Sequence, residues 1–253
     1  MAEETQYTAN TGLATISTAN ANLDGTGSIT NLILPNLIPG LQIKTISIKA
    51  TGNTTHGMIR VFVSDVTTNR LLQEIDVPAV TSSSIDPTFE TTVNLDYDLD
   101  SNHWLKVSTQ NAESFNVIAE GMDWDYYASS VRTDTTKYTA VTGMATISAA
   151  STKVLLLTAG LNGCSVESIT VKATESPVDG IISLYIYNGS TYYLFKEIKV
   201  TAVTKSSIAE SYEYTMVFEN DFELQSGYSL YVATMQAQLF RVTAEGLNWE
   251  YPA

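Results

Sequence analysis

Cysteine and histidine are almost absent from this sequence of 253 residues, which contains only Cys164, His56 and His103. One cysteine excludes an intrachain disulfide, so we expect apolar cores to hold the fold together, as in proteins made in a reducing cytoplasm. Zinc sites built from His and Cys clusters are excluded as well. Cys164 follows Asn-Gly at an expected strand start, and we predict a small buried apolar residue there rather than a nucleophile.

Basic residues and long apolar runs are also scarce. The chain has 13 Lys and Arg against 27 Asp and Glu, a net charge of −14. Phosphate backbones and anionic lipids would be repelled, so we expect no nucleic-acid partner and no membrane partner. The apolar runs are too short to span a bilayer. The N-terminal MAEETQYTAN is acidic and polar, unlike a secretory signal, and predicts synthesis in the cytoplasm.

Sequence signatures of catalysis are missing too. Neither G-x-G-x-x-G, nor G-x-x-x-x-G-K-[ST], nor G-x-S-x-G occurs, and both histidines fall in or beside expected turns. The best metal candidate is LDYDLD, where Asp96, Asp98 and Asp100 alternate. Its spacing is not that of a calcium loop, so we interpret it as a charged edge that resists sheet-to-sheet association. We therefore predict no catalytic residue, no metal, no cofactor and no enzymatic activity.

The sequence does contain a long internal repeat. GLATIS at 12–17 reappears as GMATIS at 143–148, and ISIKAT at 46–51 as ITVKAT at 169–174. AEGMDWDY at 119–126 reappears as AEGLNWEY at 244–251. The order of matches is kept throughout, which predicts a tandem duplication. We expect one domain at 1–128, a polar linker at 129–137 and a second domain at 138–253.

The two predicted domains differ in surface character. Residues 1–128 carry a net charge of −10 and residues 138–253 one of −5, whereas tyrosine is skewed the other way, with four in the first and ten in the second. Two domains that fold alike but present different surfaces suggest unequal contacts with a partner.

The periodicity of each repeat is that of β-strands. Helical periodicity is absent, and short alternating stretches rich in Thr, Val, Ile and Tyr are separated by turn residues. Eight strands in about 115 residues predict an all-β antiparallel sandwich of the jelly-roll type in each domain. An immunoglobulin-like sandwich is the alternative, although its Cys…Trp…Cys pattern is missing. In the first domain the expected strands are 12–18, 28–34, 42–50, 57–64, 70–77, 89–96, 104–110 and 115–126.

The repeated ending changes its alternation at a glycine. Phe115, Val117 and Ala119 share one parity, whereas Met122 and the aromatic residues after it have the other. A bulge at the glycine would return all of them to the core side, because a bulge inserts one residue. We therefore expect the structural anchors Gly121, Trp124 and Tyr126 in the first domain and Gly246, Trp249 and Tyr251 in the second.

Aromatic residues on one pair of equivalent strands are the best interface candidates. In GMIRVFVS and GIISLYIY, alternation places Phe62, Tyr185 and Tyr187 on the face opposite the expected core, and Tyr192 and Tyr193 follow at a hairpin. Exposed aromatic side chains on a sheet can form a protein interface or stack against sugars. They can also be ordinary half-buried strand residues, and the sequence leaves these alternatives open.

The run TGLATIS…ISIKATGNTTHGMIRVFVSD…RLLQEIDVPAVTSSS…NAESFNVIAEGMDW resembles a domain found in structural-gene regions of tailed bacteriophages. The likeness covers nearly all of the first repeat and, more weakly, the second, where GIIS replaces GMIR and MQAQLF replaces QNAESF. It implies a jelly-roll or sandwich protein of the virion, a head auxiliary or decoration protein on the capsid exterior. Its partners would be the major capsid protein or other virion proteins, with self-association, as a trimer for example.

Two alternatives to a capsid protein stay open at this point. One is an adaptor of the tail, baseplate or fibre, and the other is a tandem carbohydrate-binding module for host attachment. In each case synthesis is expected in the cytoplasm of a bacterial host.

Overall fold

The structure, a computed structural model, describes residues 4–34, 39–65, 67–127, 137–206, 208 and 210–250. Every regular element in these ranges is a strand, and no described segment forms a helix long and apolar enough to cross a membrane. The first eight strands are β1 (Glu4–Ile16), β2 (Thr30–Ile33), β3 (Pro39–Ala50), β4 (Gly57–Ser64), β5 (Asn69–Val77), β6 (Glu90–Asp100), β7 (Trp104–Thr109) and β8 (Phe115–Tyr127). The other eight are β9 (Lys137–Ile147), β10 (Val154–Thr158), β11 (Cys164–Ala173), β12 (Gly180–Tyr187), β13 (Tyr192–Val200), β14 (Glu213–Leu224), β15 (Ser229–Thr234) and β16 (Phe240–Glu250).

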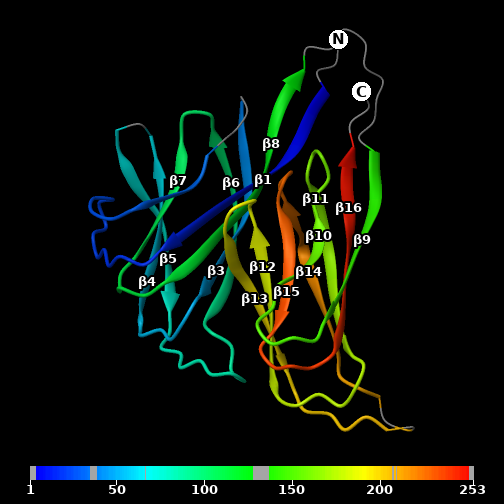
Figure 1. Cartoon of the computed structure of the whole chain (residues 1–253). Coiled ribbons are helices and arrows are strands. Elements are labelled where there is room, and N and C mark those ends of the chain that lie inside the picture. The colour runs from blue at the N-terminus through cyan, green and yellow to red at the C-terminus, as the bar shows by residue number, and fades with distance from the viewer. Residues whose placement is uncertain are drawn as a thin grey trace. The chain divides into compact units, whose positions relative to one another are not determined.

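The strands form four antiparallel four-stranded sheets (Figure 1). Strands β1 to β8 make the sheets β1-β8-β3-β6 and β2-β7-β4-β5, and strands β9 to β16 repeat this order as β9-β16-β11-β14 and β10-β15-β12-β13. Two four-stranded sheets in which the first and last strands pair, and in which the chain changes sheet at every step except between the fourth and fifth strands, form a jelly roll. The predicted all-β fold with two tandem antiparallel sandwiches is thus confirmed.

The chain divides into two compact units. The N-terminal unit comprises Met1–Thr81 and Thr88–Asp134, and the C-terminal unit comprises Ser82–Pro87 and Thr135–Ala253. The segment Ser82–Pro87, which the sequence analysis placed in the first domain, therefore groups with the C-terminal unit. Its Asp86 forms an ion pair with Lys199, with 2.7 Å between Oδ1 and Nζ. Of the predicted linker 129–137, only Lys137 lies within the described residues, and it begins β9.

Strand positions in the N-terminal unit follow the predicted ranges to within about three residues at each end, with two larger differences. The first strand runs from Glu4 to Ile16 rather than from 12 to 18, because β1 pairs with β8 without interruption from Glu4↔Tyr127 to Ile16↔Phe115. The sixth strand continues to Asp100, so the acidic LDYDLD run belongs to β6, an edge strand of its sheet.

The core of the N-terminal unit lies between its two sheets. Alternating residues of β3 and β4 meet there, among them Ile46, Ile48, Ile59 and Val61, none of which has measurable solvent exposure. Phe115, Val117 and Ala119 join them from β8, as their shared parity predicts. A two-residue period with one apolar face is what a sandwich strand needs to bury that face against the opposite sheet.

The bulge expected at Gly121 and Gly246 is wrong in its position. β8 and β16 run through these glycines without an inserted residue, and the extra residues are Lys44 in β3 and Glu167 in β11. The glycines are needed because the bulged neighbour lies close over them: a Cβ on Gly121 would overlap the carbonyl oxygen of Gln42, and one on Gly246 that of Ser165. Alternation therefore continues, and Trp249 has the opposite parity to Val242.

Candidate functional site

Four tyrosines gather on the outer face of the β10-β15-β12-β13 sheet. Tyr185 and Tyr187 alternate along β12 with the buried Leu184 and Ile186, so they point away from the core. Cross-strand partners share a face, and Tyr187 pairs with Tyr192 of β13 while Tyr185 pairs with Tyr231 of β15. We call Tyr185, Tyr187, Tyr192 and Tyr231 the tyrosine face.

The rings of the tyrosine face pack against one another. Tyr187 stacks on Tyr192 with 4.5 Å between ring centroids, and Tyr231 stands nearly perpendicular to Tyr192 at 5.0 Å. Tyr185 lies edge-on to Tyr192 at 6.5 Å. Stacked and edge-to-face pairs at such distances are the favoured aromatic geometries. The four side chains therefore form one ordered cluster rather than four separate exposed residues.

A lysine closes one side of the cluster. The Nζ atom of Lys153 lies 4.6 Å from the centre of the Tyr185 ring and 5.2 Å from that of Tyr192, within cation–π range. Burial raises the pKa of the Tyr185 hydroxyl, and desolvation together with Tyr231 raises the pKa of the Tyr192 hydroxyl. The cluster thus combines four phenol rings with one lysine side chain.

Two other predicted interface residues do not belong to this surface. Tyr193 pairs with Ile186 and so points to the opposite side of β13 from Tyr192. Phe62, the equivalent of Tyr185 in the N-terminal unit, has no measurable solvent exposure. Phe62 is therefore wrong as an exposed candidate, although its parity on β4 is the predicted one. Tyr231 and Lys153 were missed because sequence alternation does not reveal which strands pair.

A loop explains why the two equivalent faces differ. In the N-terminal unit, the loop 17–29 connects β1 to β2 and first runs beside β7. There the backbone amide of Asn20 donates to Thr109 O at 2.8 Å. They reach β4, where Arg60 Nη1 donates to Asn20 O, and continue to β5, where Asn69 Nδ2 donates to Gly25 O at 2.8 Å. Phe62 lies between these anchor points, so the loop covers it.

The corresponding loop of the C-terminal unit is shorter. Residues 148–153 start in the same way, because the Ser151 amide donates to Thr234 O at 2.7 Å, but the chain then turns directly into β10. No equivalent of the Gly25 crossing exists in this segment, and Tyr192 stands where the N-terminal unit has Asn69. Tyr192 keeps 41% of its surface exposed. Loop length, not strand sequence alone, therefore opens the tyrosine face.

The acidic and histidine candidates lie apart from the tyrosine face. Asp96, Asp98 and Asp100 are all exposed on β6, and within the described ranges no group of three His, Cys, Asp or Glu side chains could hold a metal ion. His103 Nδ1 lies 2.7 Å from Asp100 Oδ1, and this hydrogen bond lowers the pKa of the Asp100 carboxyl. His56 pairs with Asp76 at 3.1 Å, and both are exposed. Cys164 is buried, as predicted.

Of the predicted structural anchors, Trp249 is buried, with 6% of its surface exposed. Its backbone is held by two hydrogen bonds: the Trp249 amide donates to Gly163 O at 3.3 Å, and Asn162 Nδ2 donates to Trp249 O at 3.2 Å. The side chains of Trp124 and Tyr126 and the whole of Tyr251 lie outside the described residues.

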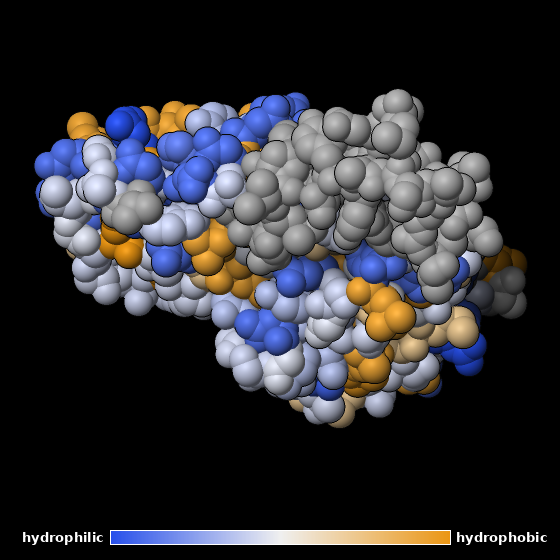
Figure 2. All heavy atoms as spheres, turned by 90° about the horizontal axis from the view of Figure 1, so that it is seen from above, coloured by the Kyte–Doolittle hydropathy of each residue, from blue (hydrophilic) through white to orange (hydrophobic). Residues whose placement is uncertain are grey.

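Apolar side chains elsewhere on the surface do not merge into one large patch on the face that Figure 2 shows; they form separate groups among polar residues. Isolated exposed apolar residues are normal for a folded protein, whereas a cluster drawn from several strands marks a binding surface. The tyrosine face is for this reason the strongest candidate for an interaction site.

No family model and no curated protein matches the sequence. Similar solved structures include the STIV MCP, with 12% identity over 96% of this chain and 97% of that chain and a TM-score of 0.29. The major capsid protein from Bacteriophage PM2 has 11% identity over 95% and 98%, with a TM-score of 0.25. The N-terminal CBM22-1-CBM22-2 tandem domain from Paenibacillus barcinonensis Xyn10C has 10% identity over 96% and 92%, with a TM-score of 0.27. Such scores assign neither a family nor a function to this chain.

Proposed function

We propose that this protein is a non-enzymatic structural protein of a phage virion, an auxiliary or decoration protein on the capsid exterior. In this proposal the tyrosine face binds the major capsid protein or another virion protein, and copies of the chain associate with one another, as a trimer for example. The observation that carries the proposal is the open tyrosine face on one of two jelly rolls with the same strand order.

The geometry of the face favours a protein partner. Its tyrosines come from β12, β13 and β15 of one sheet, so the backbone that presents them is fixed before binding. Tyrosine gives a large contact area at a low cost in side-chain entropy, and interfaces are enriched in it. A preorganised aromatic cluster of this kind is where the binding free energy of an interface concentrates.

Co-sedimentation with capsids tests the proposal. Capsids would be purified from the phage that encodes this chain after deletion of its gene, and mixed with the purified full-length protein. We expect the wild-type protein to sediment with capsids and Tyr187→Ala/Tyr192→Ala to bind about tenfold more weakly or worse, the equivalent of about 1.4 kcal/mol or more. Tyr214→Ala is the matched control, because Tyr214 is 43% exposed and lies on the other sheet.

Two results would contradict the assignment to the capsid. Wild-type protein that stays in the supernatant would exclude capsid binding, and sedimentation with purified tails instead would make the protein a tail or baseplate adaptor. If Tyr187→Ala/Tyr192→Ala bound capsids as tightly as the Tyr214→Ala control, the interface would have to lie elsewhere than on the tyrosine face. Sedimentation velocity of the protein alone measures its self-association.

The carbohydrate-binding alternative is less well supported by the ring geometry. Sugars stack on free ring faces, but Tyr192 is stacked on Tyr187, and Lys153 lies over the rings of both Tyr185 and Tyr192. A glycan array separates the two functions. Glycan binding that is lost in Tyr185→Ala and Tyr187→Ala would favour host attachment over capsid binding.

A further inference from the structure

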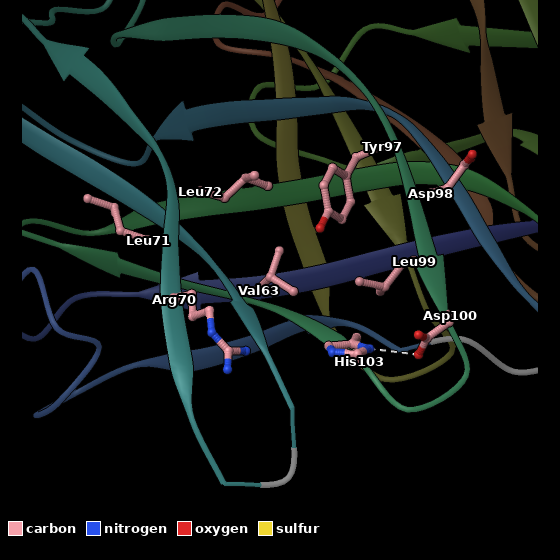
Figure 3. A pocket seen from close by; sticks show the side chains of 9 residues that line it. All are labelled: Val63, Arg70, Leu71, Leu72, Tyr97, Asp98, Leu99, Asp100 and His103. Atoms are coloured by element: carbon pink, nitrogen blue, oxygen red, sulfur yellow. Dashed lines mark hydrogen bonds and ion pairs between the residues drawn. The ribbon is translucent and has the colours of Figure 1, made fainter.

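A cavity opens at the edge of the N-terminal unit, on a different surface from the tyrosine face. It has a volume of about 290 Å³ and lies between β5 and β6, the edge strands of the two sheets. Figure 3 shows Tyr97, Leu99 and His103 on one side of it and Val63, Leu72 and Arg70 on the other. Val63, Leu72 and Tyr97 are only partly buried, so the apolar core is incomplete here.

The same place in the C-terminal unit is filled by aromatic rings. β5 has one extra residue, Leu72, relative to its partner strand β4. Its neighbours Leu71 and Gln73 pair with the consecutive β4 residues Phe62 and Val61. Phe195 is the inserted residue of β13 at the equivalent step. Tyr97 of β6 and Phe222 of β14 also occupy equivalent positions. Tyr97 pairs with Ile43 of β3, and Phe222 pairs with Val166 of β11.

Those rings are buried against each other. Phe195 and Phe222 stack with 4.5 Å between ring centroids, and each is about 1% exposed. The turn at His103, where its amide donates to Asp100 O, is repeated at Tyr228, whose amide donates to Gln225 O. The C-terminal unit thus completes with its own side chains what the N-terminal unit leaves open.

Charge around the cavity selects the kind of partner. The carboxylates of Asp98 and Asp100 are exposed at its rim, and Asp100 is also hydrogen-bonded to His103 at 2.7 Å. The positive charge of Arg70 is paired with Asp65, 3.1 Å away. Residues 1–128 carry a net charge of −10. A basic segment is therefore attracted to this rim, and an acidic one is repelled.

The volume is large enough for one aromatic side chain. Pockets that hold drug-sized ligands measure about 300–1,000 Å³, and this cavity lies at or just below that range. We propose that it receives a single aromatic side chain presented by a basic segment of a partner protein, which fills in trans the space that Phe195 fills in the C-terminal unit. This proposal is independent of the role of the tyrosine face.

A pair of synthetic peptides tests the proposal on the full-length chain. One is a pentapeptide of four lysines with a central tyrosine, and the other has alanine at the centre. In titrations followed by amide NMR shifts, we expect the tyrosine peptide to bind around Leu72 and Tyr97, and the alanine peptide to bind about tenfold more weakly or not at all.

Cavity-filling variants copied from the C-terminal unit supply the decisive comparison. Leu72→Phe/His103→Tyr should fold, because the same residues occupy the same positions of the second jelly roll, and should abolish peptide binding. Leu72→Phe alone is the second variant in case the pair does not fold, and Leu23→Phe makes the same change at an exposed site in the 17–29 loop. No binding by the wild-type chain at millimolar peptide, equal binding of both peptides, or binding retained by a folded filled variant would each overturn the proposal.

Discussion

At the scale of single residues, one buried asparagine organises the loop that distinguishes the two units. Asn20 is 6% exposed, and its Nδ2 donates to Thr26 O at 2.8 Å and to Ser28 O at 3.0 Å. Its Oδ1 accepts from the Asn22 amide at 3.0 Å. One side chain thereby satisfies three backbone groups of a loop that pairs with a strand only at Ala19, opposite Thr109 of β7, within the described residues.

Asn20→Ala should consequently destabilise the protein. The change leaves these backbone groups without their partner under the loop, which costs about 1–3 kcal/mol for buried polar groups. Urea unfolding followed by circular dichroism measures the loss. Asn22→Ala is the control, since Asn22 is exposed and should cost less than about 0.5 kcal/mol. Equal effects of the two substitutions would show that Asn20 does not hold the loop.

The thiol of Cys164 should be inert while the protein is folded. Burial, with a contribution from Glu223, raises its pKa from 9.0 to about 12. Because the folded state holds the proton more tightly, this contribution to stability is complete below the unfolded pKa and is lost as pH rises toward 12. We expect no reaction with a thiol reagent at pH 8 in buffer and complete reaction in denaturant. Reaction at the same rate in both would contradict the burial of Cys164.

At the scale of strands, the bulge in β3 and the bulge in β11 depend on the glycine opposite each. Gly121→Ala or Gly246→Ala would drive a methyl group into the neighbouring carbonyl, so we expect each to destabilise the protein by about 1–3 kcal/mol. Gly52→Ala is the matched control, since nothing lies within 4 Å of its added Cβ. Thermal unfolding of the three variants measures the difference, and a loss as large in Gly52→Ala would refute the steric explanation.

Most strand positions can be predicted from the sequence, whereas the location of the bulges and the burial of Phe62 cannot, for one common reason. Alternation and turn residues place β4 and β8 close to their observed bounds, because a strand with one apolar face has a local signature. The change of parity at Gly121 was detected, but the strand that carries the inserted residue was not, because pairing is a non-local property. The burial of Phe62 was missed for the same reason: its cover is a loop that starts 45 residues earlier in the chain.

At the scale of the whole molecule, the excess of acidic residues should control solubility. The sequence pI is about 4.4, and at neutral pH a net charge of −14 keeps the molecules apart. We expect a solubility minimum close to pH 4.4, measured by light scattering against pH, and recovery on either side of it. Greatest aggregation at neutral pH would instead point to an exposed apolar surface as the cause.

The repeated strand order also has a consequence for synthesis on the ribosome. β8 lies between β1 and β3 in its sheet, and β16 lies between β9 and β11. Until its last strand has left the exit tunnel, each jelly roll lacks a central strand and carries two unpaired edges, which favour pairing with other nascent chains. Each jelly roll is therefore completed only when β8 or β16 is added, and a chain truncated just before one of these strands should aggregate more readily than one truncated just after it.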